Sequence, residues 1–200
     1  VVRLAVSLVF ANEDGFLNSD DGSMRTLYDG TCGTCGFISD ALDMLDEWKS
    51  RKPGVSPASI VPYGQEREGV TWAVGKTNLL LRNIGSSGQD QFDAMRDLSE
   101  HIMQGDTLSD DKFEGLTFNY QLTNPPYGER LGDASEAAAL AKTLGQVWQR
   151  HPAQGLYAIT ADADFEQHFG KKAARRRKIY NGMIPCQLYM YFEQPKREKR

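Results

Sequence analysis

The chain has 200 residues, of which 40% are hydrophobic and 25% are charged, so it can bury one good core and is expected to form one domain. No apolar run is long enough to cross a membrane and the start lacks the pattern of a secretory signal, so we expect a cytoplasmic protein. Its 3 cysteines and 3 scattered histidines do not have the spacing of a disulfide framework or a zinc site, and we expect no bound metal.

The net charge of −4 is distributed unevenly along the chain. Residues 171–200 hold 10 basic and 2 acidic residues, hence +8, whereas residues 1–170 hold 13 basic and 25 acidic residues, hence −12. A basic segment that would suit a phosphate backbone consists of Lys171, Lys172, Arg175, Arg176, Arg177 and Lys178. A solvated helix end or strand rim explains these residues equally well. We expect the domain to cover residues 1–195 and residues 196–200 to form a frayed basic tail.

Apolar runs alternate with segments of helical period, which is typical of a doubly wound parallel sheet. In chain order, we expect a helix over 2–12, a strand over 26–29, a helix over 38–48 and a strand over 58–63 that ends in Gly64-Gln65-Glu66. A helix that carries Trp72, Val74, Leu79 and Leu80 follows, then a Gly- and Ser-rich loop over 85–91. Strands over 101–104 and 118–123, a helix over 134–149, a strand over 155–161 and a short helix near Phe165 complete the alternation.

A β-hairpin is expected to close the sheet. The dipeptide Asn181-Gly182 lies between the strand-like runs 178–180 and 187–192, and Asn-Gly is a strong signal for a hairpin turn. The expected architecture is therefore an α/β fold with a mostly parallel sheet of seven strands, a C-terminal antiparallel hairpin and helices on both faces.

Polar residues follow three successive strands of the expected sheet. In open α/β sheets, ligands bind outside the carboxyl ends of the strands. After Asp29, a glycine-bearing turn allows the backbone to approach the carboxylate-bearing tail of an amino acid in front of a helix N-terminus. The candidate contacts in this turn are Gly30, Thr31, Gly33, Thr34, Cys35 and Gly36. A glycine turn that serves only packing is the structural alternative.

The next two strand ends carry acidic side chains. Glu66 is placed to accept hydrogen bonds from both hydroxyls of a ribose, although a solvated Glu at a strand end is the alternative. Asp106, followed by Thr107, could accept from the amino group of an adenine, with Leu80 or Ile102 as packing partners. Together with the turn after Asp29 and with Asn124, which follows the strand over 118–123, these residues point to S-adenosylmethionine as the cofactor.

Asn124-Pro125-Pro126-Tyr127, at the end of the strand over 118–123, suits methylation of a planar exocyclic amino nitrogen. The lone pair of such a nitrogen is delocalised into the ring, which makes it a poor nucleophile. The side-chain oxygen of Asn124 and the carbonyl of Pro125 can accept hydrogen bonds from the NH₂ group and counter that delocalisation. Pro126 stiffens the segment, and Tyr127 offers a face on which an extruded base can stack. A proline turn after a strand is the structural alternative.

The first part of the chain resembles the DNA adenine-N6 methylase subunit of type I restriction-modification systems. The likeness covers residues 1–127 and rests on four segments: YDGTCGTCGF from Tyr28, Gly64-Gln65-Glu66, KTNLLL from Lys76, and Gly105-Asp106-Thr107-Leu108. It implies the class I methyltransferase fold, S-adenosyl-L-methionine and a separate specificity subunit that reads the DNA sequence. In that family a glycine usually stands where this chain has Cys35, so we expect its side chain to crowd the cofactor.

From residue 124 onward the chain resembles ribosomal RNA guanine-N2 methyltransferases that carry a THUMP domain. This likeness rests on Asn124-Pro125-Pro126-Tyr127-Gly128-Glu129-Arg130-Leu131, Phe169-Gly170-Lys171-Lys172-Ala173 and Arg177-Lys178-Ile179-Tyr180-Asn181-Gly182. The junction of two likenesses at one tetrapeptide indicates a recombined domain or an unfamiliar natural branch. The chain begins after the aromatic-Thr-Pro segment of the first family and without the THUMP domain of the second, so we expect weak binding of DNA or RNA without a partner.

These observations leave several functions open. The leading expectation is methylation of adenine N6 in DNA, because the half that carries the cofactor residues resembles the DNA family. Methylation of guanine N2 in ribosomal RNA is the alternative, and the same tetrapeptide also occurs in enzymes that methylate a glutamine side-chain amide. A domain that keeps the fold but has lost cofactor binding through Cys35 and the missing segment is the non-catalytic alternative.

Overall fold

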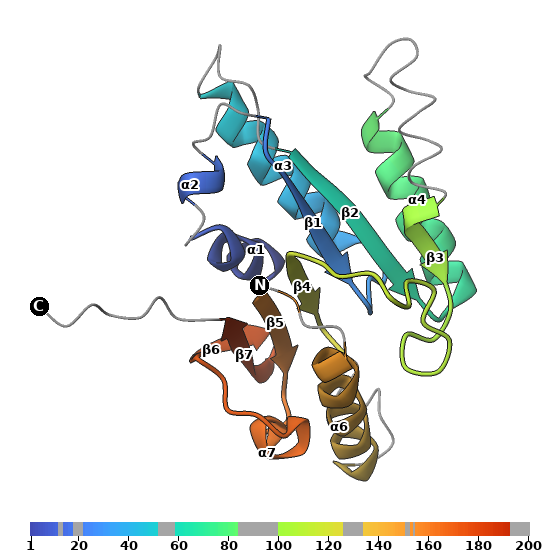
Figure 1. Ribbon diagram of the computed structural model, residues 1–200, viewed down its shortest axis with the longest axis vertical. Helices are drawn as coiled ribbons and strands as arrows, with labels where there is room; N and C mark the ends of the chain where they lie inside the picture. The colour runs from blue at the N-terminus through green and yellow to red at the C-terminus, as the bar shows by residue number, and fades with distance from the viewer. Residues whose placement is uncertain are drawn as a thin grey trace, which may run out of the picture.

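The computed structural model describes residues 1–11, 14–17, 22–51, 59–83, 100–125, 134–150, 153 and 155–192. Figure 1 shows a twisted central sheet with helices around it. The strands are β1 (Met24–Asp29), β2 (Ser59–Glu66), β3 (Ile102–Gln104), β4 (Tyr120–Thr123), β5 (Gly155–Thr160), β6 (Arg175–Asn181) and β7 (Ile184–Phe192). The helices are α1 (Val2–Phe10), α2 (Asp14–Leu17), α3 (Gly36–Ser50), α4 (Gly69–Asn83), α6 (Ala134–Arg150) and α7 (Phe165–Phe169).

In the described part of the chain, seven strands form one sheet in the order β3-β2-β1-β4-β5-β7-β6. The strands β1 to β5 are parallel to one another, whereas β7 is antiparallel to both β5 and β6. This confirms the expected parallel sheet with a C-terminal hairpin. Because the carboxyl ends of parallel strands meet at one edge, Asp29, Glu66 and Thr123 lie along the same edge of the sheet.

Side chains alternate between the two faces of the sheet, and each face is covered by different helices. Leu27, Leu122 and Ile159 belong to the larger core cluster, which includes residues of α1 and α3. Leu156 and Tyr189 belong to a second cluster, with residues of α6 and α7. The expectation of helices on both faces is thus confirmed.

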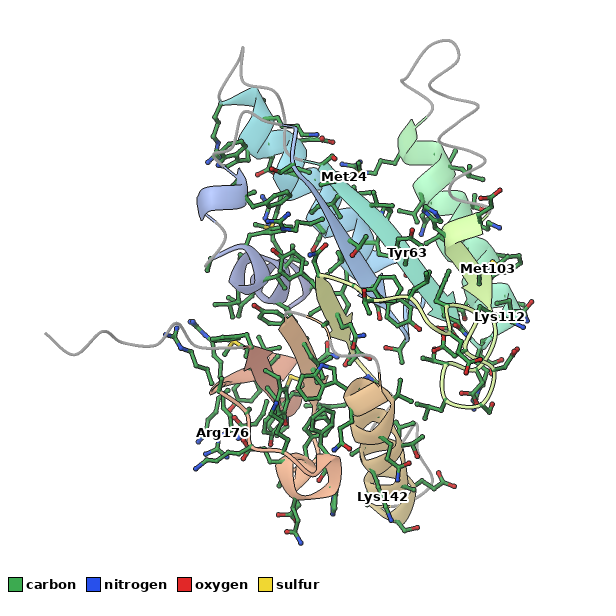
Figure 2. All side chains as sticks on the ribbon, viewed as in Figure 1. Met24, Tyr63, Met103, Lys112, Lys142 and Arg176 are labelled. Carbon is green, nitrogen blue, oxygen red and sulfur yellow. The ribbon has the colours of Figure 1, made fainter. Side chains whose placement is uncertain are left out.

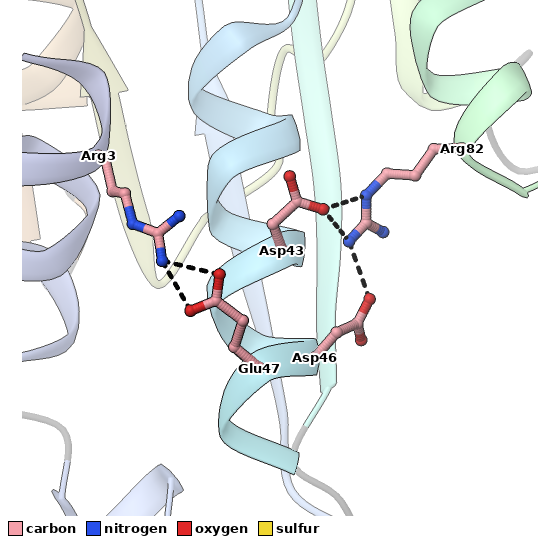
Figure 3. A network of polar contacts seen from close by, with 5 residues as sticks. All are labelled: Arg3, Asp43, Asp46, Glu47 and Arg82. Atoms are coloured by element: carbon pink, nitrogen blue, oxygen red, sulfur yellow. Dashed lines mark hydrogen bonds and ion pairs between the residues drawn. The ribbon is translucent and has the colours of Figure 1, made fainter. Parts of the chain in front are cut away.

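Ion pairs connect three helices, α1, α3 and α4 (Figure 3). The guanidinium of Arg3 on α1 lies 2.6 Å from the carboxylate of Glu47 on α3. Arg82 on α4 bridges Asp43 and Asp46 on α3 at 2.6 and 2.8 Å. Pairs in such exposed settings contribute about 0.2–1 kcal/mol each, so they orient the helices while the buried apolar clusters supply most of the stability.

The structure corrects one local expectation. Asn181 pairs with Ile184 in the ladder between β6 and β7, so the turn of the hairpin is Gly182-Met183, and Gly182 has a positive φ of 64°. On α4, Val74 is 44% exposed, whereas Gly75 and Leu79 are buried.

Some expectations fall on other parts of the chain. The loop over 85–91 and the tail over 196–200 lie outside the described residues. Within the described ranges, no helix combines the length and the apolar character that a membrane span requires.

Candidate functional site

A pocket of about 540 Å³ lies at the carboxyl ends of β1, β2 and β4. Its volume falls within the range of about 300–1,000 Å³ that is usual for small-molecule sites. Ten of the predicted cofactor contacts line this pocket: Asp29, Gly30, Thr31, Gly33, Thr34, Gly36, Glu66, Asp106, Thr107 and Asn124. Pro125 lines it as well, so one cavity joins the predicted cofactor contacts to the start of the Asn-Pro-Pro-Tyr segment.

Asp29 is the most deeply buried carboxylate in the pocket wall, with 1% of its surface exposed. Its Oδ1 accepts a hydrogen bond from the Thr31 backbone N–H at 3.0 Å. Its Oδ2 is buried and has no hydrogen-bond partner among the described residues. Burial raises the pKa of Asp29 to about 7, although the hydrogen bonds from Thr31 oppose this shift. A cationic group placed at Oδ2 would stabilise the ionised form of Asp29.

Thr31 connects the turn after β1 to the end of β4. The Thr31 hydroxyl accepts a hydrogen bond from the Asn124 backbone N–H at 3.1 Å and lies 3.0 Å from the Thr123 hydroxyl. It also lies 3.4 Å from Oδ1 of Asp29, to which it can donate. The position of Asn124 is therefore coupled to the turn that carries most of the predicted cofactor contacts.

The side-chain oxygen of Asn124 is an unused acceptor. This Oδ1 is buried and has no hydrogen-bond partner among the described residues. Leaving such an oxygen buried and unpaired costs about 1–3 kcal/mol, which a ligand N–H in the pocket would recover. Pro126 and Tyr127, the other predicted members of the segment, lie outside the described residues.

Glu66 holds the turn while retaining capacity to bind a ligand. Its Oε2 accepts a hydrogen bond from the Gly33 backbone N–H and its Oε1 accepts one from the Glu68 backbone N–H, both at 2.9 Å. Because each carboxylate oxygen has two lone pairs, both oxygens can still accept one bond from a ribose hydroxyl. Asp106 is similar, since among the described residues only its Oδ1 has a hydrogen-bond donor, the backbone N–H of Leu108 at 3.0 Å.

Cys35 differs from the other predicted contacts. Its backbone has φ 62° and ψ 31°, the left-handed conformation that residues other than glycine rarely adopt. None of its surface is exposed. Its Sγ lies 3.8 Å from Sγ of Cys32, and the side chain belongs to a core cluster with Ile38 and Leu79. The side chain thus points into the core between α3 and α4 and not into the pocket. The expectation that it crowds the cofactor is therefore wrong.

The expected packing partners for an adenine are also corrected. Ile102 is fully buried in the same cluster as Cys35, and Leu80 packs against that cluster, so neither lines the pocket. Leu108, beside Asp106, lines it instead. Sequence reasoning missed a further apolar wall formed by Leu140, Leu144 and Val147 of α6. Their helical spacing was visible in the sequence, but it is equally typical of an ordinary core face.

The pocket wall is acidic. Four carboxylates line it, from Asp29, Glu66, Glu68 and Asp106, and Arg67 supplies one positive charge. This balance favours a ligand that carries positive charge. In the described ranges, no three His, Cys, Asp or Glu side chains are grouped so as to hold a metal ion.

The predicted nucleic-acid residues lie apart from this pocket. All six are exposed: Lys171, Lys172, Arg175, Arg176, Arg177 and Lys178. The last four belong to β6, the strand at the end of the sheet order. Arg176, labelled in Figure 2, lies 3.2 Å from the carboxylate of Glu166 on α7. The Nζ of Lys171 lies 4.3 Å from the centroid of the Trp148 ring. The basic segment is thus exposed along β6 and just before it, which is compatible both with a phosphate contact and with a solvated strand rim.

A family model described as N-6 DNA Methylase matches residues 1–178 of this chain. The chain belongs to the N-6 DNA methylase family. The match continues beyond residue 127, where the likeness to the type I methylase subunit was expected to end. In this N-6 DNA methylase domain, the strand ends that carry Asp29, Glu66, Asp106 and Asn124 all fall within the matched span.

Curated relatives show both expected resemblances. The domain is 36% identical over 134 residues to the ribosomal RNA large subunit methyltransferase K/L of Marinobacter nauticus, an alignment that covers 66% of this chain and 17% of that protein. It is 29% identical over 110 residues to the type I restriction enzyme MjaIX methylase subunit of Methanocaldococcus jannaschii, covering 55% of this chain and 16% of that protein. The chain therefore spans less than a fifth of the length of either relative.

A solved structure supports the fold independently. The structure of SMU.472, described as a methyltransferase complexed with SAH, superposes with a TM-score of 0.65 at 19% identity. The superposition covers 96% of this chain and 52% of that chain. Together with the strand order, this likeness confirms the class I methyltransferase fold of the N-6 DNA methylase domain.

Proposed function

We propose that this chain is an S-adenosylmethionine-dependent methyltransferase domain that acts on the exocyclic amino group of a nucleic-acid base. Membership of the N-6 DNA methylase family supports the reaction class. The observation that carries the proposal is the buried Oδ1 of Asn124, an acceptor without a partner in the described structure, in a pocket that also contains Asp29, Glu66 and Asp106.

The pocket fits the proposed cofactor. S-adenosylmethionine carries a sulfonium and an amino-acid ammonium, and the wall that would face them is acidic. The unpaired Oδ2 of Asp29 is a suitable acceptor for the ammonium, which would restore the ionised carboxylate. Glu66 and Asp106 keep acceptor sites for the ribose and the adenine. The complex of SMU.472 with SAH supports this choice of ligand.

When bound, S-adenosylmethionine supplies an electrophilic methyl group, so the protein has mainly to align it with the target nitrogen and to exclude water. Asn124 Oδ1 and the Pro125 carbonyl accept from the target NH₂ group and favour the geometry in which its lone pair can form the new N–C bond. Thr31 fixes the backbone of Asn124 through the hydrogen bond at 3.1 Å. The proton of the alkylated nitrogen then leaves to solvent, and no strong base is needed.

Adenine N6 in DNA is the substrate that the family match favours. Guanine N2 in ribosomal RNA is the second candidate, and the 36% identity to the ribosomal RNA methyltransferase K/L of Marinobacter nauticus supports it. The exposed basic residues from Lys171 to Lys178 would contact the nucleic-acid backbone. Sequence recognition would come from a separate specificity subunit or recognition domain, as the likeness to type I methylase subunits implies.

The experiment that tests the proposal is methyl transfer from radiolabelled S-adenosylmethionine to duplex DNA and to ribosomal RNA fragments, followed by nucleoside mass spectrometry. N6-methyladenine in DNA supports the first candidate, and N2-methylguanine in RNA supports the second. Asn124→Ala should abolish turnover while leaving calorimetric cofactor affinity nearly unchanged. An equal loss of both would contradict the role assigned to Asn124.

A catalytically incomplete domain is the remaining candidate. One of the two reasons for this candidate was the side chain of Cys35, and that side chain points away from the pocket. Calorimetric titration with S-adenosylmethionine separates the two cases, because an incomplete domain would show no binding. Glu66→Ala is the control that removes the proposed acceptor for the ribose hydroxyls. It also removes the acceptor for two backbone N–H groups, from Gly33 and Glu68. Its thermal stability must therefore be measured in parallel.

A further inference from the structure

The tip of the β6–β7 hairpin extends beyond the sheet edge where the pocket lies. Thr160, the last residue of β5, pairs with Gln187, so β7 begins three residues beyond the end of β5. At about 3.3 Å per residue, the tip projects roughly 10 Å past that end. β7 is two strands away from β4, or roughly 10 Å to the side of Asn124. The tip is thus placed to contact a macromolecule whose reacting group enters the pocket.

The tip is unusually apolar for an exposed turn. Tyr180 is 66% exposed, Met183 is 94% exposed and Ile184 is 44% exposed. These three residues, which we call the apolar tip, lie within five positions of one another, whereas six other exposed large hydrophobic residues are spread over the rest of the described chain. The turn itself needs only the positive φ of Gly182. Clustered apolar exposure commonly marks a binding surface.

Positive charge accompanies the apolar tip along β6. In a strand, every second side chain lies on the same face, so Arg176, Lys178 and Tyr180 share one face of β6. This face is directed toward α7, because Arg176 contacts Glu166 on that helix. Arg177 and Lys178 are exposed, and no carboxylate of the described residues forms an ion pair with either one. A polyanion would therefore be attracted to this strand and repelled by the acidic pocket wall.

We propose that the β6–β7 hairpin is the contact for an unstacked nucleic-acid strand, with β6 holding the phosphates and the apolar tip filling the space vacated by an extruded base. This inference rests on the proposed function, because a base that enters the pocket has to leave its stack. Exposed Met and Ile side chains are among those that proteins insert between base steps, and Tyr can stack on a base. Charge complementarity selects this occupant over an apolar protein surface.

The test measures the binding of fluorescein-labelled oligonucleotides of about 20 nucleotides to the full chain by anisotropy. The probes are single-stranded DNA, single-stranded RNA, a fully paired duplex and a duplex with one mismatch. Met183→Ser and Tyr180→Ala are compared with Leu81→Ser, a substitution of an exposed apolar side chain on α4. Lys178→Ala is compared with Lys49→Ala, a charge removal in the last turn of α3.

The tip variants should lose at least about fivefold in affinity for the single-stranded and mismatched probes, and less for the paired duplex. Lys178→Ala should weaken all probes and lower the slope of log affinity against log salt by about one. The two control variants should bind like the wild type. The fluorescence of a 2-aminopurine at the extruded position should increase when the wild type binds and should stay low when Met183→Ser binds.

Two outcomes would overturn the inference. In the first, the tip variants bind every probe with the affinity of the wild type, as expected if the tip binds a protein. In the second, the wild type binds none of the probes at low salt. Failure of the proposed function is distinguishable. Loss of probe binding in the tip variants would support the hairpin contact even if no base were methylated. Methylation with an unchanged KM in these variants would support the function and exclude the contact.

Discussion

Replacing Thr31 by valine tests whether the turn after β1 positions Asn124. Valine keeps the shape of threonine but removes the hydroxyl, which accepts from the Asn124 N–H at 3.1 Å and lies 3.0 Å from the Thr123 hydroxyl. The main loss is the acceptor for a backbone N–H, which costs about 1–3 kcal/mol. For a chain of this size that corresponds to a fall in Tm of about 2–4 °C per kcal/mol.

The same substitution should affect catalysis more than cofactor binding. The backbone hydrogen bond from Thr31 to Asp29 does not involve the hydroxyl and is retained. Asn124 loses its anchor, and a displacement of about 1 Å at a reacting centre can cost on the order of 100-fold in rate. We therefore expect a fall in kcat of at least about tenfold, with little change in the dissociation constant of S-adenosylmethionine.

Thr31→Ser is the matched control. It keeps the hydroxyl and loses one methyl group, which costs about 0.8 kcal/mol if that group is buried. The assays are thermal unfolding followed by circular dichroism, calorimetric titration with S-adenosylmethionine, and initial rates of methyl transfer. Equal Tm and equal kcat for the valine and serine variants would refute the reasoning, because they would show that the hydroxyl does not hold Asn124.

Three further predictions concern other residues of the site and its support. Cys35→Gly should change cofactor affinity by less than about twofold, because the side chain points into the core; a tenfold gain measured by calorimetry would restore the crowding hypothesis. The pKa of Asp29 is raised to about 7, so the carboxyl is protonated below that pH and loses its attraction for a cation. Affinity for S-adenosylmethionine should fall by up to about tenfold per unit as the pH is lowered from 7 to 5, and Asp29→Asn should bind weakly without this dependence. Gly145→Ala should destabilise the fold by about 1–3 kcal/mol, since its Cβ would overlap the carbonyl oxygen of Phe169; a rise in Tm would show that helix propensity outweighs the clash.

Much of the fold could be predicted from local patterns. Alternating apolar runs and helical periods identify β1, β2 and β4, because these strands are buried and bounded by turn residues. The hairpin was predicted, but its turn was misplaced by one residue. Both Asn181 and Gly182 tolerate a positive φ, and only the pairing of Asn181 with Ile184 decides which of them turns.

The site was predictable where chemistry follows from position along the chain. Asp29, Glu66 and Asn124 are polar residues at or just after strand ends, and parallel strands bring such ends together. The direction of the Cys35 side chain was not predictable. It depends on a left-handed turn and on the space between α3 and α4, which residues distant in sequence create.

The fold class, the family likeness and the residue types available at the sheet edge follow from the order of residues along the chain, because they depend on periodicity and motifs. Which atoms of those residues remain available to a ligand depends on how the chain folds. Thr31 uses Oδ1 of Asp29 and the backbone N–H of Asn124, which leaves Oδ2 of Asp29 and Oδ1 of Asn124 without partners in the described structure. The pairing of Thr31 with Asn124 joins residues 93 positions apart, and only the folded chain brings them within hydrogen-bonding distance.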